Sequence, residues 1–186
     1  MMRWMSLVWL ALMAVPVSAQ PAKVIILRHA EKPADESKES LSIQGQERAM
    51  ALVPLLTQTP ELIGTNRAVA LFATRISERS TNNHTHETLE PLAARLGLKI
   101  RAPFANSEYQ ALAERVLMST ACKGKTVVIC WTHARISGLV SALGVSPEPP
   151  PWDQRVYDRL WVITYDRGKA RLVDLPQRLL YGDSDR

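Results

Sequence analysis

Cysteine is scarce in this chain. Only Cys122 and Cys130 occur among its 186 residues. Cys130 lies in the apolar run Thr126–Trp131, which reads as a buried strand and would carry its thiol away from Cys122. We therefore expect two free or buried thiols, and a disulfide between them is the alternative.

Clusters of basic residues are also missing. The chain has 23 Lys and Arg against 18 Asp and Glu, which gives a net charge of +5. No run of Lys or Arg, and no alternation of basic with aromatic residues, marks a nucleic-acid surface. We expect no nucleic-acid partner, whereas the mild positive excess is compatible with a small anionic substrate.

No apolar run is long enough for a comfortable membrane span, which takes roughly 20 residues. The stretch Leu7–Val15 follows Arg3 and precedes Pro16 and the small residues Val17-Ser18-Ala19. This order is typical of a secretory signal peptide that is cleaved after Ala19, and an uncleaved anchor is the alternative. No cysteine lies near Ala19, so we expect no lipid attachment there.

Cleavage after Ala19 would leave residues 20–186 as one domain of 167 residues with a net charge of +4. We find no internal repeat in it. The signal peptide predicts a periplasmic or secreted protein with no stable membrane span after cleavage.

Apolar strands alternate with amphipathic helices along this domain. The predicted strands are Val24–Leu27, Ala68–Ala73, Leu98–Arg101 and Thr126–Trp131, followed by a hairpin of Leu160–Tyr165 and Ala170–Leu175. The predicted helices are one that opens at Leu41-Ser42, with Ser42 as its cap, and Thr88–Leu96, Glu108–Met118 and Ile136–Leu143. The alternation predicts an α/β fold, a three-layer α/β/α sandwich with a mainly parallel central sheet.

Two strands are followed directly by histidine. Arg28 and His29 come after the first strand, and His133 comes after the strand Thr126–Trp131. Ligands of open α/β sheets gather outside the carboxyl ends of the strands, so both histidines can meet in one crevice. Arg suits phosphate, and imidazole can act as a nucleophile or as an acid and base, so the pattern favours phosphoryl chemistry.

These residues belong to longer motifs that resemble the histidine phosphatase superfamily, also called phosphoglycerate-mutase-like, and in particular a small secreted branch of it. The matching segments follow the family's order and cover nearly the whole domain; they are Leu27–Lys32, Leu41–Ala49, Glu87–Ala93, Val127–His133 and Tyr157–Trp161. The resemblance implies the phosphoglycerate-mutase-like fold and an exported, cofactor-independent phosphomonoester hydrolase.

The resemblance also implies roles for single residues. His29 would attack phosphorus and become phosphohistidine, which water then hydrolyses. Arg28 would hold the phosphoryl oxygens, and His133 would donate a hydrogen bond to them. No metal is required.

The chain departs from the family pattern at His84, where a second phosphate-binding Arg is normal. Neutral imidazole has one donor where Arg has five, and a protonated imidazole loses its charge above about pH 6.5. Arg75 and Arg79 could replace the missing charge. We leave open whether His84 lies in the pocket or in a solvated loop.

The proton donor for the leaving group is a second open point, because Ala134 follows His133 where some relatives have Asp. Glu108 is the candidate acid, and a carboxylate that only serves a helix dipole is the alternative. Glu31 is a candidate to contact the substrate or orient His29, or it pairs with Lys32.

Two further features weigh less. The pair His84 and His86 is a weak metal motif, and we expect no metal. The aromatic residues that we assign to packing rather than to a ligand cage are Trp131, Trp152, Tyr157 and Trp161.

The substrate class stays broad. A small phosphorylated molecule or an envelope glycan phosphate would meet the variable loops at 33–40 and 102–107. The alternative function is a catalytically weak phosphate- or polyanion-binding protein of the same fold; a mutase ranks third, because long insertions are missing. The sequence leaves the oligomeric state open.

Overall fold

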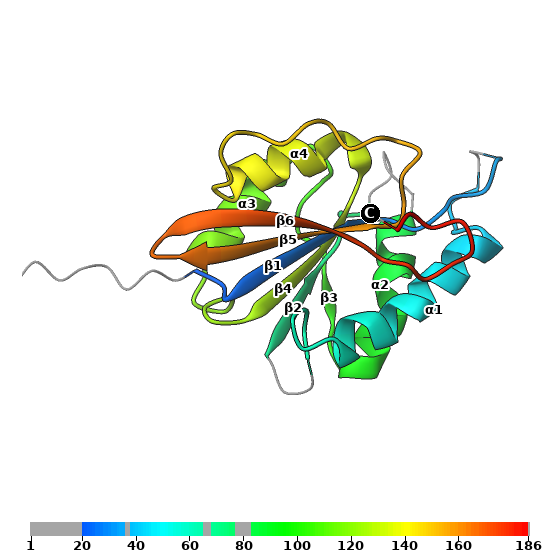
Figure 1. Ribbon diagram of the computed structural model, residues 1–186, viewed down its shortest axis with the longest axis horizontal. Coiled ribbons are helices and arrows are strands. Elements are labelled where there is room, and N and C mark those ends of the chain that lie inside the picture. The colour runs from blue at the N-terminus through cyan, green and yellow to red at the C-terminus, as the bar shows by residue number, and fades with distance from the viewer. Residues whose placement is uncertain (1–19, 36–37, 65–67, 77–82, 186) are drawn as a thin grey trace, which may run out of the picture.

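The computed structural model describes residues 20–35, 38–64, 68–76 and 83–185. The predicted signal peptide, residues 1–19, lies outside the described residues. Figure 1 shows the elements, which in chain order are β1 (Lys23–Arg28), α1 (Ile43–Gln58), β2 (Val69–Phe72), α2 (His84–Leu96), β3 (Ile100–Arg101), α3 (Tyr109–Met118), β4 (Thr126–Trp131), α4 (His133–Ala142), β5 (Arg159–Asp166) and β6 (Lys169–Pro176).

The strands form one sheet in the order β3-β2-β4-β1-β5-β6. The pairs β3–β2, β2–β4 and β4–β1 are parallel, whereas β1–β5 and the hairpin β5–β6 are antiparallel. The mainly parallel central sheet is therefore confirmed, with the predicted hairpin as its antiparallel edge. In the register of β1 and β4, Arg28 lies opposite Trp131, so these two central strands end side by side.

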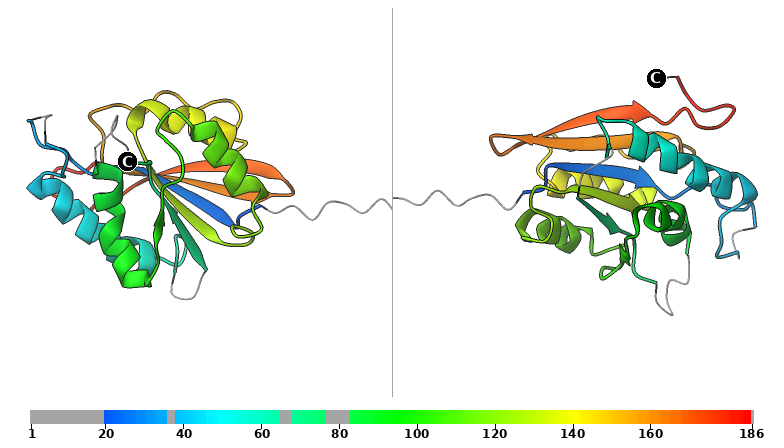
Figure 2. Two further views of the ribbon diagram at one scale, coloured as in Figure 1. Left: turned by 180° about the vertical axis from the view of Figure 1, so that it is seen from behind. Right: turned by 90° about the horizontal axis from the view of Figure 1, so that it is seen from below.

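The sheet is covered on both faces. Alternate residues of β1 enter opposite cores, because successive side chains of a strand point to opposite faces. Val24 and Ile26 pack into the core that holds residues of α3 and α4, and Ile25 and Leu27 into the core that holds residues of α1 and α2. Figure 2 shows the same two helix pairs on opposite sides of the sheet, which confirms the three-layer sandwich.

Two helices begin earlier than the sequence predicts. α2 begins at His84 rather than Thr88, and α4 begins at His133 rather than Ile136. The apolar repeat that marks a helix starts only after the first turn in both cases, because these first turns carry mainly polar residues. The prediction was wrong at both boundaries, and the correction places both histidines at the start of a helix.

Hydrogen bonds hold the start of α1 to the segment that follows His29. The side chain of Ser42 accepts a hydrogen bond from the N–H of Gly45, so Ser42 is the N-cap, as predicted. The backbone N–H of Ser42 and its hydroxyl both donate to the carbonyl of Glu31. A Cβ at Gly45 would lie 2.2 Å from that carbonyl oxygen, so only glycine permits the contact.

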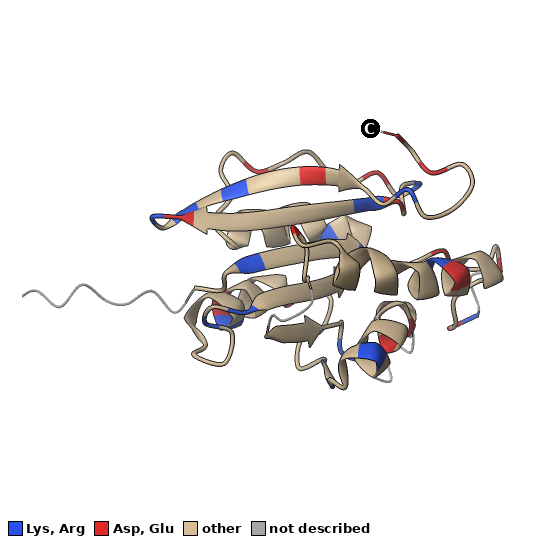
Figure 3. Cartoon of the chain, turned by 60° about the horizontal axis from the view of Figure 1, so that its bottom comes forward, with Lys and Arg blue, Asp and Glu red and all other residues tan. Residues whose placement is uncertain are grey.

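Three properties of the described residues bear on the composition-based expectations. Cys122 and Cys130 are both free and buried, which confirms the prediction. No helix in the described part of the chain is long and apolar enough to cross a membrane. Figure 3 shows basic and acidic residues interspersed along the same strands and helices.

Candidate active site

His29 lies at the end of β1 and is almost fully buried. Its backbone N–H donates to the carbonyl of Trp131 at 3.1 Å, which extends the pairing of β1 and β4 by one residue. Its Nδ1 lies 2.8 Å from the carbonyl oxygen of Ala30. Because a carbonyl can only accept, this contact assigns the ring proton to Nδ1 and leaves the lone pair on Nε2.

The surroundings of His29 keep its ring neutral. Its pKa is lowered to about 3, chiefly by burial; the positive charges of Arg28, His84 and His133 add to this effect, and the hydrogen bond with the Ala30 carbonyl opposes it. A neutral imidazole with a free Nε2 is the form that can attack an electrophile. The neutral ring of His29 is therefore chemically capable of nucleophilic attack at neutral pH.

The loop after His29 is tied to the first turn of α2. The N–H of Ala30 donates to the hydroxyl of Thr88 at 2.9 Å, and that hydroxyl donates to the carbonyl of His84 at 2.6 Å. All three residues are buried. Thr88 thus holds the backbone N–H of Ala30, the residue whose carbonyl contacts His29, and the backbone carbonyl of His84.

His84 is buried beside His29 and does not lie in a solvated loop, one of the two alternatives. Its side chain is buried, and its ring centroid lies 5.2 Å from that of His29. Its Nε2 lies 3.2 Å from the carbonyl oxygen of Ser40. Burial lowers the pKa of His84 below its ordinary value, although backbone hydrogen bonds partly oppose this. The chain therefore places a mainly neutral ring where the family has Arg.

Of the two arginines that could replace this charge, Arg75 is engaged elsewhere. Its guanidinium pairs with Glu108 at 3.2 Å and donates to the carbonyl of Pro103 at 2.8 Å. Arg79 lies outside the described residues.

Arg28 is held by the segment that precedes β5. Its guanidinium donates to the carbonyls of Gln154 and Val156 and, at 2.9 Å, to the hydroxyl of Tyr157. Its Cζ also lies 3.7 Å from the centroid of the Tyr157 ring, a close cation–π contact. Burial lowers the pKa of Arg28, yet guanidinium stays charged at neutral pH. The segment 154–157 therefore holds a buried cation beside His29.

His133 is the first residue of α4, immediately after the cap residue Thr132. The Thr132 hydroxyl donates to the side-chain oxygen of Asn106 at 2.7 Å, which ties the loop before α3 to the end of β4. Burial lowers the pKa of His133, and the charge of Arg28 adds to this. His133 also lines a cavity of about 300 Å³ with Tyr109, Arg135 and Trp152, among others. Of the three histidines of the site, only His133 lines this cavity.

The two predicted carboxylates make other contacts. Glu108 is the N-cap of α3; its carboxylate accepts from the N–H of Ala105 at 2.7 Å and pairs with Arg75. Glu31 pairs with Arg48 at 2.7 Å. The structure thus brings Arg28, His29, His84 and His133 together, whereas the roles of Glu31 and Glu108 in binding and catalysis stay predictions.

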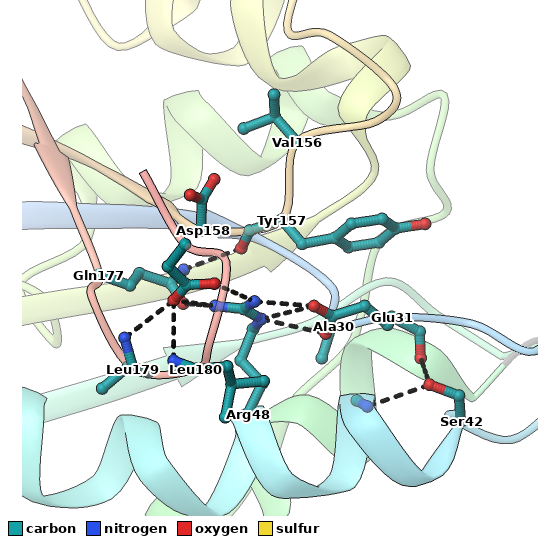
Figure 4. A network of polar contacts seen from close by, with 12 residues as sticks. Ala30, Glu31, Ser42, Arg48, Val156, Tyr157, Asp158, Gln177, Leu179 and Leu180 are labelled. Atoms are coloured by element: carbon teal, nitrogen blue, oxygen red, sulfur yellow. Dashed lines mark hydrogen bonds and ion pairs between the residues drawn. The ribbon is translucent and has the colours of Figure 1, made fainter. Parts of the chain in front are cut away.

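A buried ionic network beside the site was missed by the sequence analysis. Arg48, which is 3 % exposed, bridges Glu31 and Asp183 at 2.7 Å each and donates to Gln177 at 3.0 Å (Figure 4). Burial raises the pKa of Asp183, but hydrogen bonds from Arg48, Leu179 and Leu180 outweigh it, and the resulting pKa lies below its ordinary value. A signal for Arg48 was present, because it precedes the core residues Leu52 and Leu56 at spacings of four.

Tyr157 was also missed as a member of the site. The sequence analysis assigns it to packing, but its ring meets the His29 ring at a centroid distance of 6.0 Å as well as holding Arg28. Its position in the segment that resembles the family was the one signal that could have singled it out.

The comparisons with known proteins identify the fold. No family model and no curated protein sequence matches this chain. Among solved structures, the chain is similar to the alpha-ribazole phosphatase from Shigella flexneri, with 14 % identity and a TM-score of 0.51, over 85 % of this chain and 98 % of that one. It is also similar to a mycobacterial glucosyl-3-phosphoglycerate phosphatase solved with VO3, with 14 % identity and a TM-score of 0.51, over 82 % and 97 %.

A third similar structure is the phosphoglycerate mutase from Bacillus anthracis, with 10 % identity and a TM-score of 0.51, over 84 % of this chain and 93 % of that one. At these identities the likeness concerns the fold. The chain shares the fold of these two phosphatases and of this phosphoglycerate mutase, and the phosphoglycerate-mutase-like fold that the sequence motifs predict is confirmed.

Proposed function

We propose that this chain is an exported phosphomonoester hydrolase that acts through a phosphohistidine on His29. The observation that carries the proposal is the contact between His29 Nδ1 and the Ala30 carbonyl at 2.8 Å. It leaves Nε2 free, and burial keeps the ring neutral with a pKa of about 3. The fold shared with two phosphatases and a phosphoglycerate mutase supports the same reaction class.

In the first step, the Nε2 lone pair attacks phosphorus and the bond from phosphorus to the ester oxygen breaks. The leaving oxygen takes up a proton and departs as an alcohol. The ring becomes cationic when phosphorus is bound to Nε2, and the Ala30 carbonyl, which accepts from Nδ1, stabilises this charge. Water then attacks phosphorus, the nitrogen–phosphorus bond breaks, and inorganic phosphate and neutral His29 are released.

In this proposal, positively charged and hydrogen-bond-donating groups stabilise the phosphoryl group in both steps. Phosphoryl transfer spreads negative charge over the non-bridging oxygens, so preorganised donors and cations lower its barrier. Arg28 supplies a buried cation and His133 a ring donor, whereas the Nε2 of His84 faces the carbonyl of Ser40. The proposed reaction therefore needs no metal or cofactor.

Glu108 is the proposed proton donor for the leaving oxygen. Glu108 is the N-cap of α3, and nearby Asn106 accepts a hydrogen bond from Thr132, which precedes His133. Glu108→Gln should lower kcat for esters of poorly acidic alcohols by about 100-fold, while phosphate binding is kept. A kcat within threefold of the wild type would remove Glu108 from the reaction.

The export and the substrate class rest on other grounds. Export rests on the residues 1–19, and it is tested by cell fractionation after expression with and without this segment. The proposed substrate is a small phosphorylated molecule or an envelope glycan phosphate. The named substrates of the two phosphatases of similar fold are small phosphate esters, which supports the former.

Detection of the phosphohistidine intermediate tests the proposed hydrolase activity. Residues 20–186 are incubated with labelled phosphomonoesters and quenched in alkali, in which phosphohistidine is stable. We expect acid-labile label on the wild type and none on His29→Asn. His86→Gln is the matched control, because His86 contacts the carbonyl of Thr74, and it should keep the label. No label together with no phosphate release would contradict the proposal.

The alternative is a phosphate-binding protein with little turnover. Two observations favour it: His84 replaces an arginine, and the carbonyls of Gln154 and Val156 engage the guanidinium of Arg28. This function predicts that calorimetry detects binding of inorganic phosphate while no ester of the panel is hydrolysed.

A further inference from the structure

Tyr157 contacts both Arg28 and His29, the cation and the nucleophile of the proposed reaction. Its hydroxyl accepts a hydrogen bond from Arg28 at 2.9 Å, and its ring stacks on the same guanidinium at 3.7 Å. The edge-on contact with the His29 ring, at 6.0 Å and 65°, places the same side chain beside the nucleophile. Half-buried Tyr157 is therefore in contact with both the cation and the attacking ring.

The position of Tyr157 is fixed by buried groups behind it. Its carbonyl accepts from the side-chain amide of Gln177 at 3.0 Å, and the amide oxygen of Gln177 accepts from Arg48 at 3.0 Å. Arg48 in turn holds Glu31, which lies two residues after His29. Through Gln177 and Glu31, Arg48 thus connects the backbone of Tyr157 to the loop that follows His29. These contacts fix the position of Tyr157 relative to that loop.

The hydroxyl of Tyr157 has a proton to give. A phenol has one O–H donor and also accepts hydrogen bonds, and the contact with Arg28 uses only its acceptor side. The proton can then point to an anionic oxygen that Arg28 binds. Such a charge-assisted hydrogen bond is the kind that stabilises a phosphoryl group most.

We propose that Tyr157 is a further catalytic residue of this site, which positions Arg28 and donates its phenolic hydrogen bond to a non-bridging oxygen of the phosphoryl group attacked by His29. The proposal rests on the proposed function, because it needs a phosphoryl group at His29. An arginine at position 84 would offer five donors, whereas the Nε2 of His84 faces the carbonyl of Ser40. The hydroxyl of Tyr157 would supply a donor in place of these.

The test removes only the oxygen of Tyr157. Tyr157→Phe keeps the stacked ring, and we expect kcat to fall about 10- to 100-fold, the effect of losing one donor to a developing charge. The affinity for orthovanadate, a mimic of the transition state, should fall by a similar factor, whereas the melting temperature stays within about 2 °C. Tyr165→Phe is the matched control, because its hydroxyl donates to the carbonyl of Leu143 away from the site, and it should leave kcat unchanged.

A double-mutant cycle separates direct contact from positioning alone. If Tyr157 acts only by placing Arg28, Tyr157→Phe has no effect on vanadate affinity in an Arg28→Ala background. The proposal predicts that a loss of at least about threefold remains in that background. The absence of any remaining loss would overturn the direct contact.

The outcomes for the two proposals are distinguishable. If the wild type forms phosphohistidine while Tyr157→Phe matches it in kcat and in vanadate affinity, the role of Tyr157 is wrong and the hydrolase stands. An equal loss in Tyr165→Phe would also overturn that role. If the wild type neither turns over an ester nor binds phosphate or vanadate, the proposed function fails and the role of Tyr157 fails with it.

Discussion

Replacing His29 with Asn should change how the stability of this protein depends on pH. In the folded state the pKa of His29 is about 3, whereas an unfolded chain has a histidine pKa of about 6.5. The folded state therefore favours the neutral ring, and its contribution to stability is full above pH 6.5. As the pH falls below 6.5 the unfolded chain takes up a proton that the folded one refuses, and stability is lost until the pH reaches about 3.

The size of the effect follows from the same two pKa values. Each pH unit between them costs about 1.4 kcal/mol, so the loss at pH 5 is about 2 kcal/mol relative to pH 7. His29→Asn lacks the titrating ring but keeps a short amide donor for the Ala30 carbonyl. We expect the wild type to lose about 2 kcal/mol more than this variant between pH 7 and pH 5.

Urea unfolding at the two pH values measures this difference, with the free energy of unfolding obtained by linear extrapolation. His86→Gln serves again as the control and should follow the wild type. Equal losses for the wild type and His29→Asn would refute the burial of a neutral ring and, with it, the reason given for the proposed role of His29 as a nucleophile at neutral pH.

Two other substitutions test the surroundings of His29. Arg48→Ala leaves two buried carboxylates without their cation, so urea unfolding should show a loss of about 3–5 kcal/mol, and a loss below about 1 kcal/mol would contradict the network. For His84, whose pKa burial lowers, kcat/KM should decline as the pH rises through a value below 6.5, because the ring loses its charge. His84→Arg should flatten this decline in a pH–rate profile. If the profile of the variant equals that of the wild type, His84 does not act as a cation.

The local patterns of the sequence predict the framework of the site. The apolar runs before Arg28 and His133 mark β1 and β4, and parallel strands that end side by side bring their following residues together. The cap at Ser42 and the stop at Gly97 follow from local hydrogen bonding and from a positive φ, which depend on few neighbouring residues. Such features are readable because their causes lie within a few positions.

The missed features depend on contacts between distant segments. Arg48 reaches Asp183 and Gln177 from a helix that is more than a hundred residues earlier, and no local rule pairs them. The sequence around Tyr157 indicates only an aromatic packing residue, because its contact with Arg28 forms between segments that are distant in the chain. The starts of α2 and α4 were missed because their first turns, which begin with His84 and His133, give no apolar periodicity.

The most direct test of the central claim is the position of phosphorus on the ring of His29. The wild type is phosphorylated by a substrate, quenched in alkali, and examined by NMR with ¹⁵N-labelled histidine. The account predicts phosphorus on Nε2, with the proton kept on Nδ1, because Nδ1 donates to the carbonyl of Ala30 at 2.8 Å. Phosphorus on Nδ1, or on a histidine other than His29, would contradict it.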